Sequence, residues 1–188
     1  MKQRKFITRH EVERLLEATK EGRYPERDYC MLLMAFLHGF RVSELRYLSI
    51  SDIDLIQNVV YVRRLKGGLS TIQPLEPLEV DAIESWLNKR QFFAVAEDNW
   101  LFLSQKHQPL SRSQIFRLMQ KYGELAGLEV TVHPHMLRHA CGYALADLGR
   151  DTRLIQDYLG HRNILHTVIY TASNQKRFTG IWKPVPQY

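Results

Sequence analysis

Near the end of the chain, Tyr170 lies nine residues after a leucine–glycine–histidine step that ends at His161. A phenol has an ordinary pKa of about 10, so its hydroxyl is a weak nucleophile near neutral pH. It attacks an electrophile only when other groups accept its proton or supply a strong field. Otherwise a tyrosine is an apolar anchor with a polar tip. The residues that the rest of the chain gathers around Tyr170 therefore decide its role.

A histidine and an arginine, His135 and Arg138, stand three residues apart in the segment "HPHMLRHA", for which a helix is predicted. Residues three apart share a helix face, and a guanidinium beside an imidazole suits an anion. His135 and His139, four apart, are alternatively a metal pair. The segment lacks the glutamate of HExxH, and no third ligand is evident, so we predict no metal site. An isolated HxxR pair is a weak signal, because most such pairs have no role.

Two further cations precede this segment. Arg41 follows a glycine that ends a predicted helix, and Glu44 stands three residues later, where its carboxylate can orient a neighbouring side chain. The alternative is a purely structural Arg41–Glu44 ion pair. Lys66 comes directly before two glycines, where a hairpin tip can carry an ammonium group into a site, although most hairpin lysines stay in solvent.

Positive charge is clustered along the chain. The 188 residues carry a formal net charge of +6, and the pI is about 9.4. Three stretches contain cations but no acid: residues 100–122, the segment "VRRLKGG" and residues 174–188. Their cations are Lys106, Arg112, Arg117 and Lys121; Arg63, Arg64 and Lys66; and Lys176, Arg177 and Lys183. Such clusters suit a phosphate-binding surface, although a solvated basic face fits the composition equally well.

Helices must position most of these residues. Helix-start signals are capping boxes, prolines in the first turn, and an aspartate N-cap. They occur at Thr8 with Glu11, Pro25, Ser111 with Gln114, Pro134 and Asp151. Together with apolar residues at helical spacing, they predict helices over residues 8–20, 25–39, 77–90, 111–125, 134–148, 151–160 and 164–170.

The apolar period changes around Val60 and Val62, where β-branched residues predict strands, and the Gly67–Gly68 step predicts a tight hairpin turn. "NWLFLS" is predicted to be a short buried strand or turn. There is no internal repeat or long linker. We therefore expect one domain of the mainly α (α+β) class, with a small antiparallel sheet.

Composition limits the class of protein. Hydrophobic residues make up 45% and charged residues 24%, an ordinary globular mixture. No apolar run approaches the length of a membrane span, and the first residues lack the apolar core of a secretion signal. Cys30 and Cys141 lie in apolar helical patterns and are predicted to be reduced, packed thiols. A soluble intracellular protein is the simplest expectation.

The order of the candidate residues is more specific than any one of them. Arg-x-x-Glu at 41–44, a hairpin lysine at 66, His-x-x-Arg at 135–138, Leu-Gly-His ending at 161 and Tyr170 resemble the catalytic domain of the tyrosine recombinases, the phage integrase family. The segments that most resemble the short bacterial recombinases that invert fimbrial promoter switches are 131–143, "DTRLIQDYLGHRNI" and "YTASNQKRFTGIW".

The resemblance implies a covalent mechanism. Tyr170 would attack a DNA phosphodiester and leave a 3′-phosphotyrosine and a free 5′-hydroxyl. His135 would accept the tyrosine proton, and Lys66 would protonate the departing 5′-oxygen, because an alkoxide is a poor leaving group.

The resemblance also assigns the electrostatic roles. Arg41 and Arg138 would neutralise charge on the nonbridging phosphate oxygens, and His161 would donate a hydrogen bond to one of them. Glu44 would orient this basic cluster. No cofactor or metal is implied, since the arginines and the lysine supply the positive charge, and the bond energy is kept in the phosphotyrosine.

The implied partner is double-stranded DNA at inverted repeat sites, bound by a homotetramer on two sites, in the cytoplasm at the bacterial nucleoid. The helix that begins near Ser111 is expected to lie across the duplex. The candidate DNA contacts are Arg63, Arg64, Arg112, Arg117 and Lys121.

The domain organisation departs from that of larger family members, which carry a separate N-terminal DNA-binding domain. Only 40 residues precede Arg41, and their pattern belongs to the same domain. We expect one catalytic domain over 1–188 without a core-binding domain, in a naturally short recombinase or a fragment, with DNA-bending accessory proteins as partners. The segment "SNQKRFTGIW" is expected to dock on a neighbouring protomer through Phe178, Ile181 and Trp182, or to pack on its own core.

Two other functions remain open. A type IB topoisomerase shares the chemistry but relaxes supercoils without exchanging strands between sites. A DNA-binding regulator on an inactive recombinase domain would be expected to have lost the tyrosine or an arginine, and neither is lost here.

Overall fold

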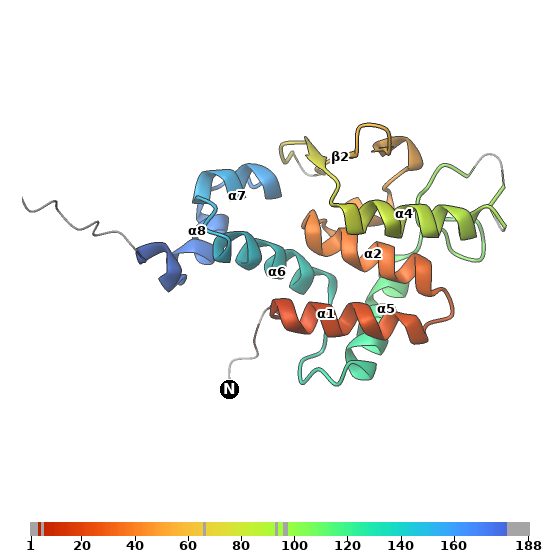
Figure 1. Cartoon of the computed structure of the whole chain (residues 1–188), viewed down its shortest axis with the longest axis horizontal. Coiled ribbons are helices and arrows are strands. Elements are labelled where there is room, and N and C mark those ends of the chain that lie inside the picture. The colour runs from red at the N-terminus through yellow and green to blue at the C-terminus, as the bar shows by residue number, and fades with distance from the viewer. Residues whose placement is uncertain (1–3, 5, 66, 93, 96–97, 180–188) are drawn as a thin grey trace, which may run out of the picture.

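The computed structural model describes residues 4, 6–65, 67–92, 94–95 and 98–179, and in this part of the chain it is mainly helical (Figure 1). The α-helices are α1 (Arg9–Ala18), α2 (Pro25–Leu37), α3 (Val42–Arg46), α4 (Pro77–Arg90), α5 (Arg112–Leu125), α6 (Pro134–Asp147), α7 (Thr152–Leu159) and α8 (Leu165–Ala172). Short 3-10 helices cover Thr19–Glu21, Ile50–Asp52 and Gln175–Phe178. The strands are β1 (Ile53–Asp54), β2 (Val59–Val62) and β3 (Thr71–Pro74). The predicted fold class is confirmed.

The helices begin where local capping chemistry places them. The Thr8 side chain accepts a hydrogen bond from the Glu11 amide, and the Glu11 carboxylate accepts one from the Thr8 amide at 2.7 Å. Ser111 and Gln114 form the same reciprocal pair at the start of α5. Asp151 accepts from the Leu154 amide at the start of α7. Each bond satisfies an amide that would otherwise have no partner inside the helix, so these predicted starts are confirmed.

Helix α2 is the centre of the core. Its middle residues are apolar on nearly every side, and Cys30, Met31, Leu32 and Met34 have no exposed surface. A helix that is hydrophobic all round must be covered by other elements. Helices α1, α4 and α6 pack against α2, which lies between α1 and α4 in Figure 1.

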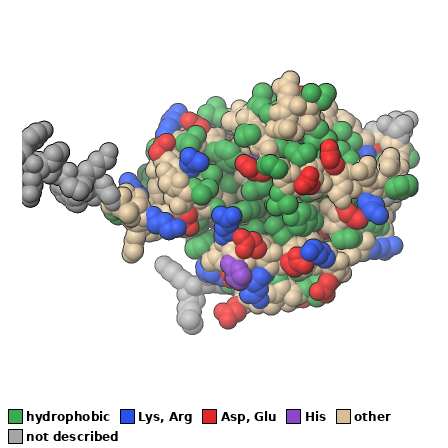
Figure 2. Space-filling model, viewed as in Figure 1, with side chains coloured by type: hydrophobic (Ala, Val, Ile, Leu, Met, Phe, Trp, Pro, Cys, Tyr) green, Lys and Arg blue, Asp and Glu red, His purple; other side chains and the backbone are tan. Residues whose placement is uncertain are grey.

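A second, smaller cluster of buried side chains joins α6, α7 and α8. It contains Cys141, Ile155, Leu159 and Tyr170. Hydrophobic side chains also gather at the centre of the face seen in Figure 2. The candidate nucleophile is therefore held by the packing of three helices from the last third of the chain.

The sheet is smaller than its sequence pattern predicts. Its order is β1-β2-β3, all antiparallel, and Val62 pairs with Thr71 at the end of the β2–β3 ladder. The predicted hairpin is confirmed, because β2 and β3 pair antiparallel, but the strands end at Val62 and Thr71. A loop therefore joins them, and the prediction that the turn at Gly67–Gly68 is tight is wrong. The Arg64 amide donates to the Ser70 hydroxyl at 3.1 Å instead of to a strand carbonyl. Lys66 lies outside the described residues.

Other expectations fare differently. The stretch after Arg41 forms α3, a helix that was not predicted. Leu101, Phe102 and Leu103 are buried, and Leu103 forms an isolated bridge with Pro109. Both cysteines are free and buried, as predicted. In the described ranges, no helix combines the length and apolarity needed to cross a membrane.

Candidate active site

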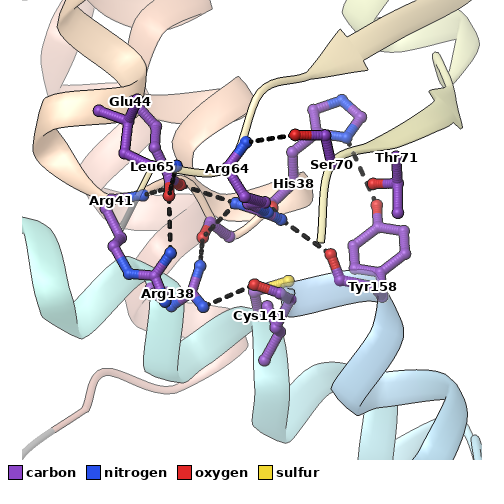
Figure 3. Close-up of polar contacts among 12 residues, drawn as sticks. His38, Arg41, Glu44, Arg64, Leu65, Ser70, Thr71, Arg138, Cys141 and Tyr158 are labelled. Atoms are coloured by element: carbon purple, nitrogen blue, oxygen red, sulfur yellow. Dashed lines mark hydrogen bonds and ion pairs between the residues drawn. The ribbon is translucent and has the colours of Figure 1, made fainter. Parts of the chain in front are cut away.

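Glu44 is the centre of a buried ionic cluster at the start of α3 (Figure 3). Its carboxylate pairs with Arg41 at 2.7 Å and with Arg64 at 2.9 Å, and it also accepts from the amides of Arg41 and Leu65. Burial raises the pKa of Glu44, but the charge of Arg64 and the hydrogen bonds from Arg41 and Arg64 outweigh burial and lower that pKa overall. Glu44 is therefore ionised and holds the two arginines, as the sequence predicted for Arg41.

Arg138 reaches the same place from α6. Its guanidinium is almost fully buried and donates to the backbone carbonyls of Gly39 and, at 2.7 Å, Leu159. Burial, followed by the charges of Arg64 and Arg41, lowers the pKa of Arg138 to about 10. The group stays cationic at neutral pH, so the guanidinium groups of Arg138 and Arg41 stand together where an anion can be bound.

Arg64 corrects the sequence interpretation. It was assigned to a DNA-contacting surface, but its side chain has no exposed area. It donates to Glu44 and to the carbonyls of His38 and Tyr158, the last two at 2.8 Å (Figure 3). Arg64 thus joins the end of β2 to α2, α3 and α7.

Tyr170 lies in α8 and is 2% exposed. Its hydroxyl is 3.0 Å from Nδ1 of His139, its ring stacks on His161, and the ring of Tyr143 meets it edge-on. Burial raises the pKa of Tyr170 to about 12, with partial compensation by the charge of Arg138. The phenol is therefore protonated at neutral pH and needs a proton acceptor before it can act as a nucleophile.

His161 is buried beside both arginines and the tyrosine. Burial, followed by the charges of Arg138 and Arg41, lowers its pKa to about 3, so the ring is neutral near pH 7. Its Nδ1 is 2.9 Å from the Thr167 hydroxyl. If Nδ1 accepts from that hydroxyl, Nε2 carries the hydrogen and can donate to a phosphate oxygen.

The remaining predicted residues are placed differently. His135 is exposed in the first turn of α6, where its ring meets that of His133 at a centroid distance of 6.4 Å, and the Tyr170 hydroxyl contacts the imidazole of His139. In the described part of the chain, no three His, Cys, Asp or Glu residues are grouped to hold a metal ion. The structure therefore gathers Arg41, Glu44, Arg138, His161 and Tyr170.

A basic cleft lies apart from this cluster. Arg117 and Lys121 of α5 line a cleft of about 690 Å³ together with Arg23, Arg27 and Lys106. Arg63 and Arg112 are also exposed, and Arg63 pairs with Asp52 at 2.8 Å. The sequence interpretation did not single out Arg23 and Arg27. Arg23 and Arg27 lie far from α5 along the chain, so the sequence did not indicate that they line the same cleft as Arg117 and Lys121.

Gly142 of α6 provides the space for the tyrosine ring. A Cβ at this position would lie 2.6–2.7 Å from three ring atoms of Tyr170. Alanine is the better helix former by up to about 1 kcal/mol, so Gly142→Ala is expected to leave the fold intact while displacing the ring. A misplacement of about 1 Å can cost on the order of 10²-fold in rate.

We expect Gly142→Ala to lower the rate of covalent attachment to DNA at least about tenfold, with little change in DNA affinity. The measurement is a time course of adduct formation on a denaturing gel. Ala144→Gly, which changes helix propensity at another position of α6, is the control. An unchanged rate in Gly142→Ala would show that the ring does not need this contact.

Known proteins resemble this chain over nearly its whole length. The model of the phage integrase family matches residues 5–177. The type 1 fimbriae regulatory proteins FimB and FimE of Escherichia coli strain K12 are 55% and 48% identical to the chain. FimB is matched over 96% of this chain and 90% of its own length, and FimE over 97% and 93%.

A crystal structure of XerA recombinase superimposes with a TM-score of 0.82 at 31% identity, covering 100% of this chain and 68% of the other. The ordered residues from Arg41 to Tyr170, their convergence in the fold and these matches support one conclusion. The chain belongs to the phage integrase family, the tyrosine recombinases.

Proposed function

We propose that the chain is a site-specific DNA recombinase that cuts and rejoins double-stranded DNA through a 3′-phosphotyrosine at Tyr170. The observation that carries this proposal is the grouping of Arg41, Arg138 and His161 with Tyr170, from four separate parts of the fold: His161 lies beside both arginines and stacks on the ring of Tyr170. Isolated cations on a surface would bind a phosphate without bringing a nucleophile to it.

The chemistry is a transesterification. The Tyr170 oxygen attacks phosphorus as its proton passes to a histidine, and the bond from phosphorus to the 5′-oxygen breaks. Arg41 and Arg138 neutralise charge on the nonbridging oxygens, and His161 donates a hydrogen bond to one of them. Lys66 is our candidate to protonate the departing 5′-oxygen. In rejoining, a 5′-hydroxyl attacks the phosphotyrosine, so no external energy source is needed.

We propose that DNA is bound through phosphate contacts of the exposed cations Arg63, Arg112, Arg117 and Lys121. Phosphate contacts position a protein on the duplex, whereas contacts with base edges provide specificity. Arg117 and Lys121 line the basic cleft, which gives a concave surface of positive potential beside α5.

A salt titration tests this surface. Removing one phosphate contact is expected to reduce the slope of log affinity against log salt by about 0.9, so Arg112→Ala should show this change in fluorescence anisotropy with labelled duplex DNA. Lys89→Ala, which removes an exposed cation of α4, is the control and should leave the slope unchanged. An Arg112→Ala slope equal to that of the wild type would remove Arg112 from the interface.

We further propose that the DNA target is a promoter element of a fimbrial phase switch, flanked by inverted repeats. The high identity to FimB and FimE over nearly the whole chain supports this. A homotetramer on two sites, DNA-bending accessory proteins and a cytoplasmic, nucleoid-associated location belong to the same proposal.

The C-terminal segment is our candidate for contact between protomers. Phe178 is 56% exposed, so it does not pack on its own core, while Ile181 and Trp182 lie outside the described residues.

A nicked suicide duplex from the neighbourhood of the gene tests the chemistry. The nick lets the short 5′-hydroxyl fragment diffuse away, so the phosphotyrosine accumulates and survives a denaturing gel. A recombinase forms this adduct and also inverts a plasmid segment between inverted repeats, which a restriction digest detects. Plasmid relaxation without inversion would indicate a topoisomerase, and the absence of any adduct would indicate a DNA-binding regulator.

A further inference from the structure

We propose that the buried pair of His38 and Glu79 positions the active-site arginines. The pair acts through the backbone turn that follows α2, because the carbonyl groups of this turn bind guanidinium groups of the site. This role rests on the proposed function and deepens it, since it adds two positioning residues from outside the catalytic cluster.

The turn after α2 offers its carbonyl groups to two arginines. The last carbonyls of a helix have no partner inside the helix. Here Arg64 donates to the carbonyl of His38 at 2.8 Å and to that of Gly39 at 3.3 Å, and Arg138 also donates to the Gly39 carbonyl (Figure 3). Arg41 follows two residues later on the same stretch of backbone. A shift of this turn would therefore displace the partners of two guanidinium groups and the backbone that carries the third.

The turn needs support from a side chain. Gly39 has a φ of +56°, in the left-handed region that favours glycine, and a Cβ at this position would lie 2.5 Å from the Leu159 side chain. Glycine has more conformational freedom than any other residue, so the backbone alone does not hold the turn in one orientation. His38, the residue before it, is the C-cap of α2 and is buried. Its side chain can therefore fix the turn.

The imidazole of His38 is held from two sides. Nδ1 is 2.7 Å from Oε1 of Gln73 in β3, and Nε2 is 2.7 Å from Oε1 of Glu79 in α4. The amide nitrogen of Gln73 donates to the Thr71 hydroxyl and to the Tyr158 carbonyl, both at 2.9 Å. The amide oxygen is left for the ring, so Nδ1 of His38 carries a hydrogen. The ring thus ties the end of α2 to the sheet and to α4.

Glu79 completes this arrangement. It is fully buried, and its second carboxylate oxygen accepts from the Glu76 amide at 3.2 Å at the start of α4. In the described part of the chain, Nε2 of His38 and Oε1 of Glu79 have no hydrogen-bond partner apart from each other. One proton must lie between these two atoms, on the imidazolium or on the carboxyl group. Each group therefore fixes the other, because loss of one partner leaves a buried polar atom unsatisfied.

Stability alone does not require this pair. Replacement of a buried ion pair by apolar side chains of similar volume is often neutral or even stabilising. Apolar packing is not directional, whereas a hydrogen bond depends on the angle at its donor. The contacts of His38 with Gln73 and Glu79 therefore fix the orientation of the turn, on which the arginines depend.

The test compares Glu79→Gln with the double variant His38→Phe, Glu79→Leu. Glutamine can donate from its amide nitrogen to a neutral Nε2, so Glu79→Gln keeps the contact. The double variant removes both polar groups together, so it leaves no buried charge without its partner. With the nicked duplex at saturating concentration, the rate of adduct formation is measured separately from the affinity for DNA.

We expect the double variant to fold and to bind DNA with nearly the wild-type affinity. At saturation it should form the adduct at least about tenfold more slowly, because a misplacement of about 1 Å can cost on the order of 10²-fold in rate. Glu79→Gln should keep most of the wild-type rate. Ile83→Ala is the control, because it removes buried apolar atoms one turn further along α4 without changing the pair. It should lower the unfolding temperature and keep the wild-type rate while it is folded.

The positioning role is overturned if the double variant forms the adduct at the wild-type rate, or if its loss lies entirely in DNA affinity. It is also overturned if Ile83→Ala is slowed to the same extent, or if Glu79→Gln is as slow as the double variant. If the double variant does not fold, Glu79→Leu replaces it with the same expectation. Failure of the wild type to form an adduct would instead reject the proposed function.

Discussion

Tyr170→Phe is expected to abolish the covalent protein–DNA adduct completely while leaving DNA affinity and folding nearly unchanged. The substitution removes only the hydroxyl, so the ring keeps its contacts with Gly142, Tyr143 and His161. The lost hydrogen bond to His139 is worth about 1 kcal/mol of folding free energy, a small fraction of the stability of a domain. No other atom at this position can form the phosphate ester.

The measurement is the denaturing gel with the nicked duplex, with anisotropy as the affinity check. Tyr158→Phe is the matched control, because Tyr158 is also largely buried and its hydroxyl donates to the Leu37 carbonyl at 2.9 Å. We expect that variant to form the adduct. A denaturant-stable adduct with Tyr170→Phe would identify another nucleophile.

Arg64→Met is expected to destabilise the fold by about 3–5 kcal/mol, because breaking a buried ion pair leaves a charge without its partner. The substitution removes the guanidinium that pairs with Glu44 and satisfies the carbonyls of His38 and Tyr158. Methionine fills much of the space, so the loss reports mainly on these polar contacts. The measurement is urea unfolding followed by circular dichroism.

Arg63→Met is the control next to it. Its guanidinium is largely exposed and pairs with Asp52 at the surface, and such pairs contribute at most about 1 kcal/mol. In the double variant Arg64→Met with Glu44→Gln, the cost should be smaller than the sum of the two single costs, because neither partner is left charged. Equal stability of Arg64→Met and Arg63→Met would contradict the structural role of Arg64.

The Arg64 cluster also bears on activity. Glu44 binds Arg41 and Arg64 together, so loss of Arg64 leaves Glu44 and Arg41 free to rearrange beside Arg138. In a variant that still folds, the rate of DNA cleavage should therefore fall by a larger factor than the affinity for DNA.

The amino-acid sequence by itself determined the helical framework and the order of the site residues. The helix starts at Thr8, Ser111 and Asp151 depend on hydrogen bonds between residues three positions apart, so their signals lie within a few letters of sequence. The order and spacing of the residues from Arg41 to Tyr170 likewise indicate the family, which the match to the family model confirms.

The tertiary structure decided the positions of neighbouring residues of the same type, which the sequence alone could not distinguish. Arg63 and Arg64 are neighbours of identical type, yet one is exposed and the other is buried on Glu44, because successive side chains at the end of a strand point to opposite sides. His135 and His139 are likewise one helical turn apart, and only the packing of α8 on α6 brings one of them to Tyr170. Caps are local, whereas burial and partner choice depend on segments far apart in the chain, which is why the sequence could not distinguish these pairs.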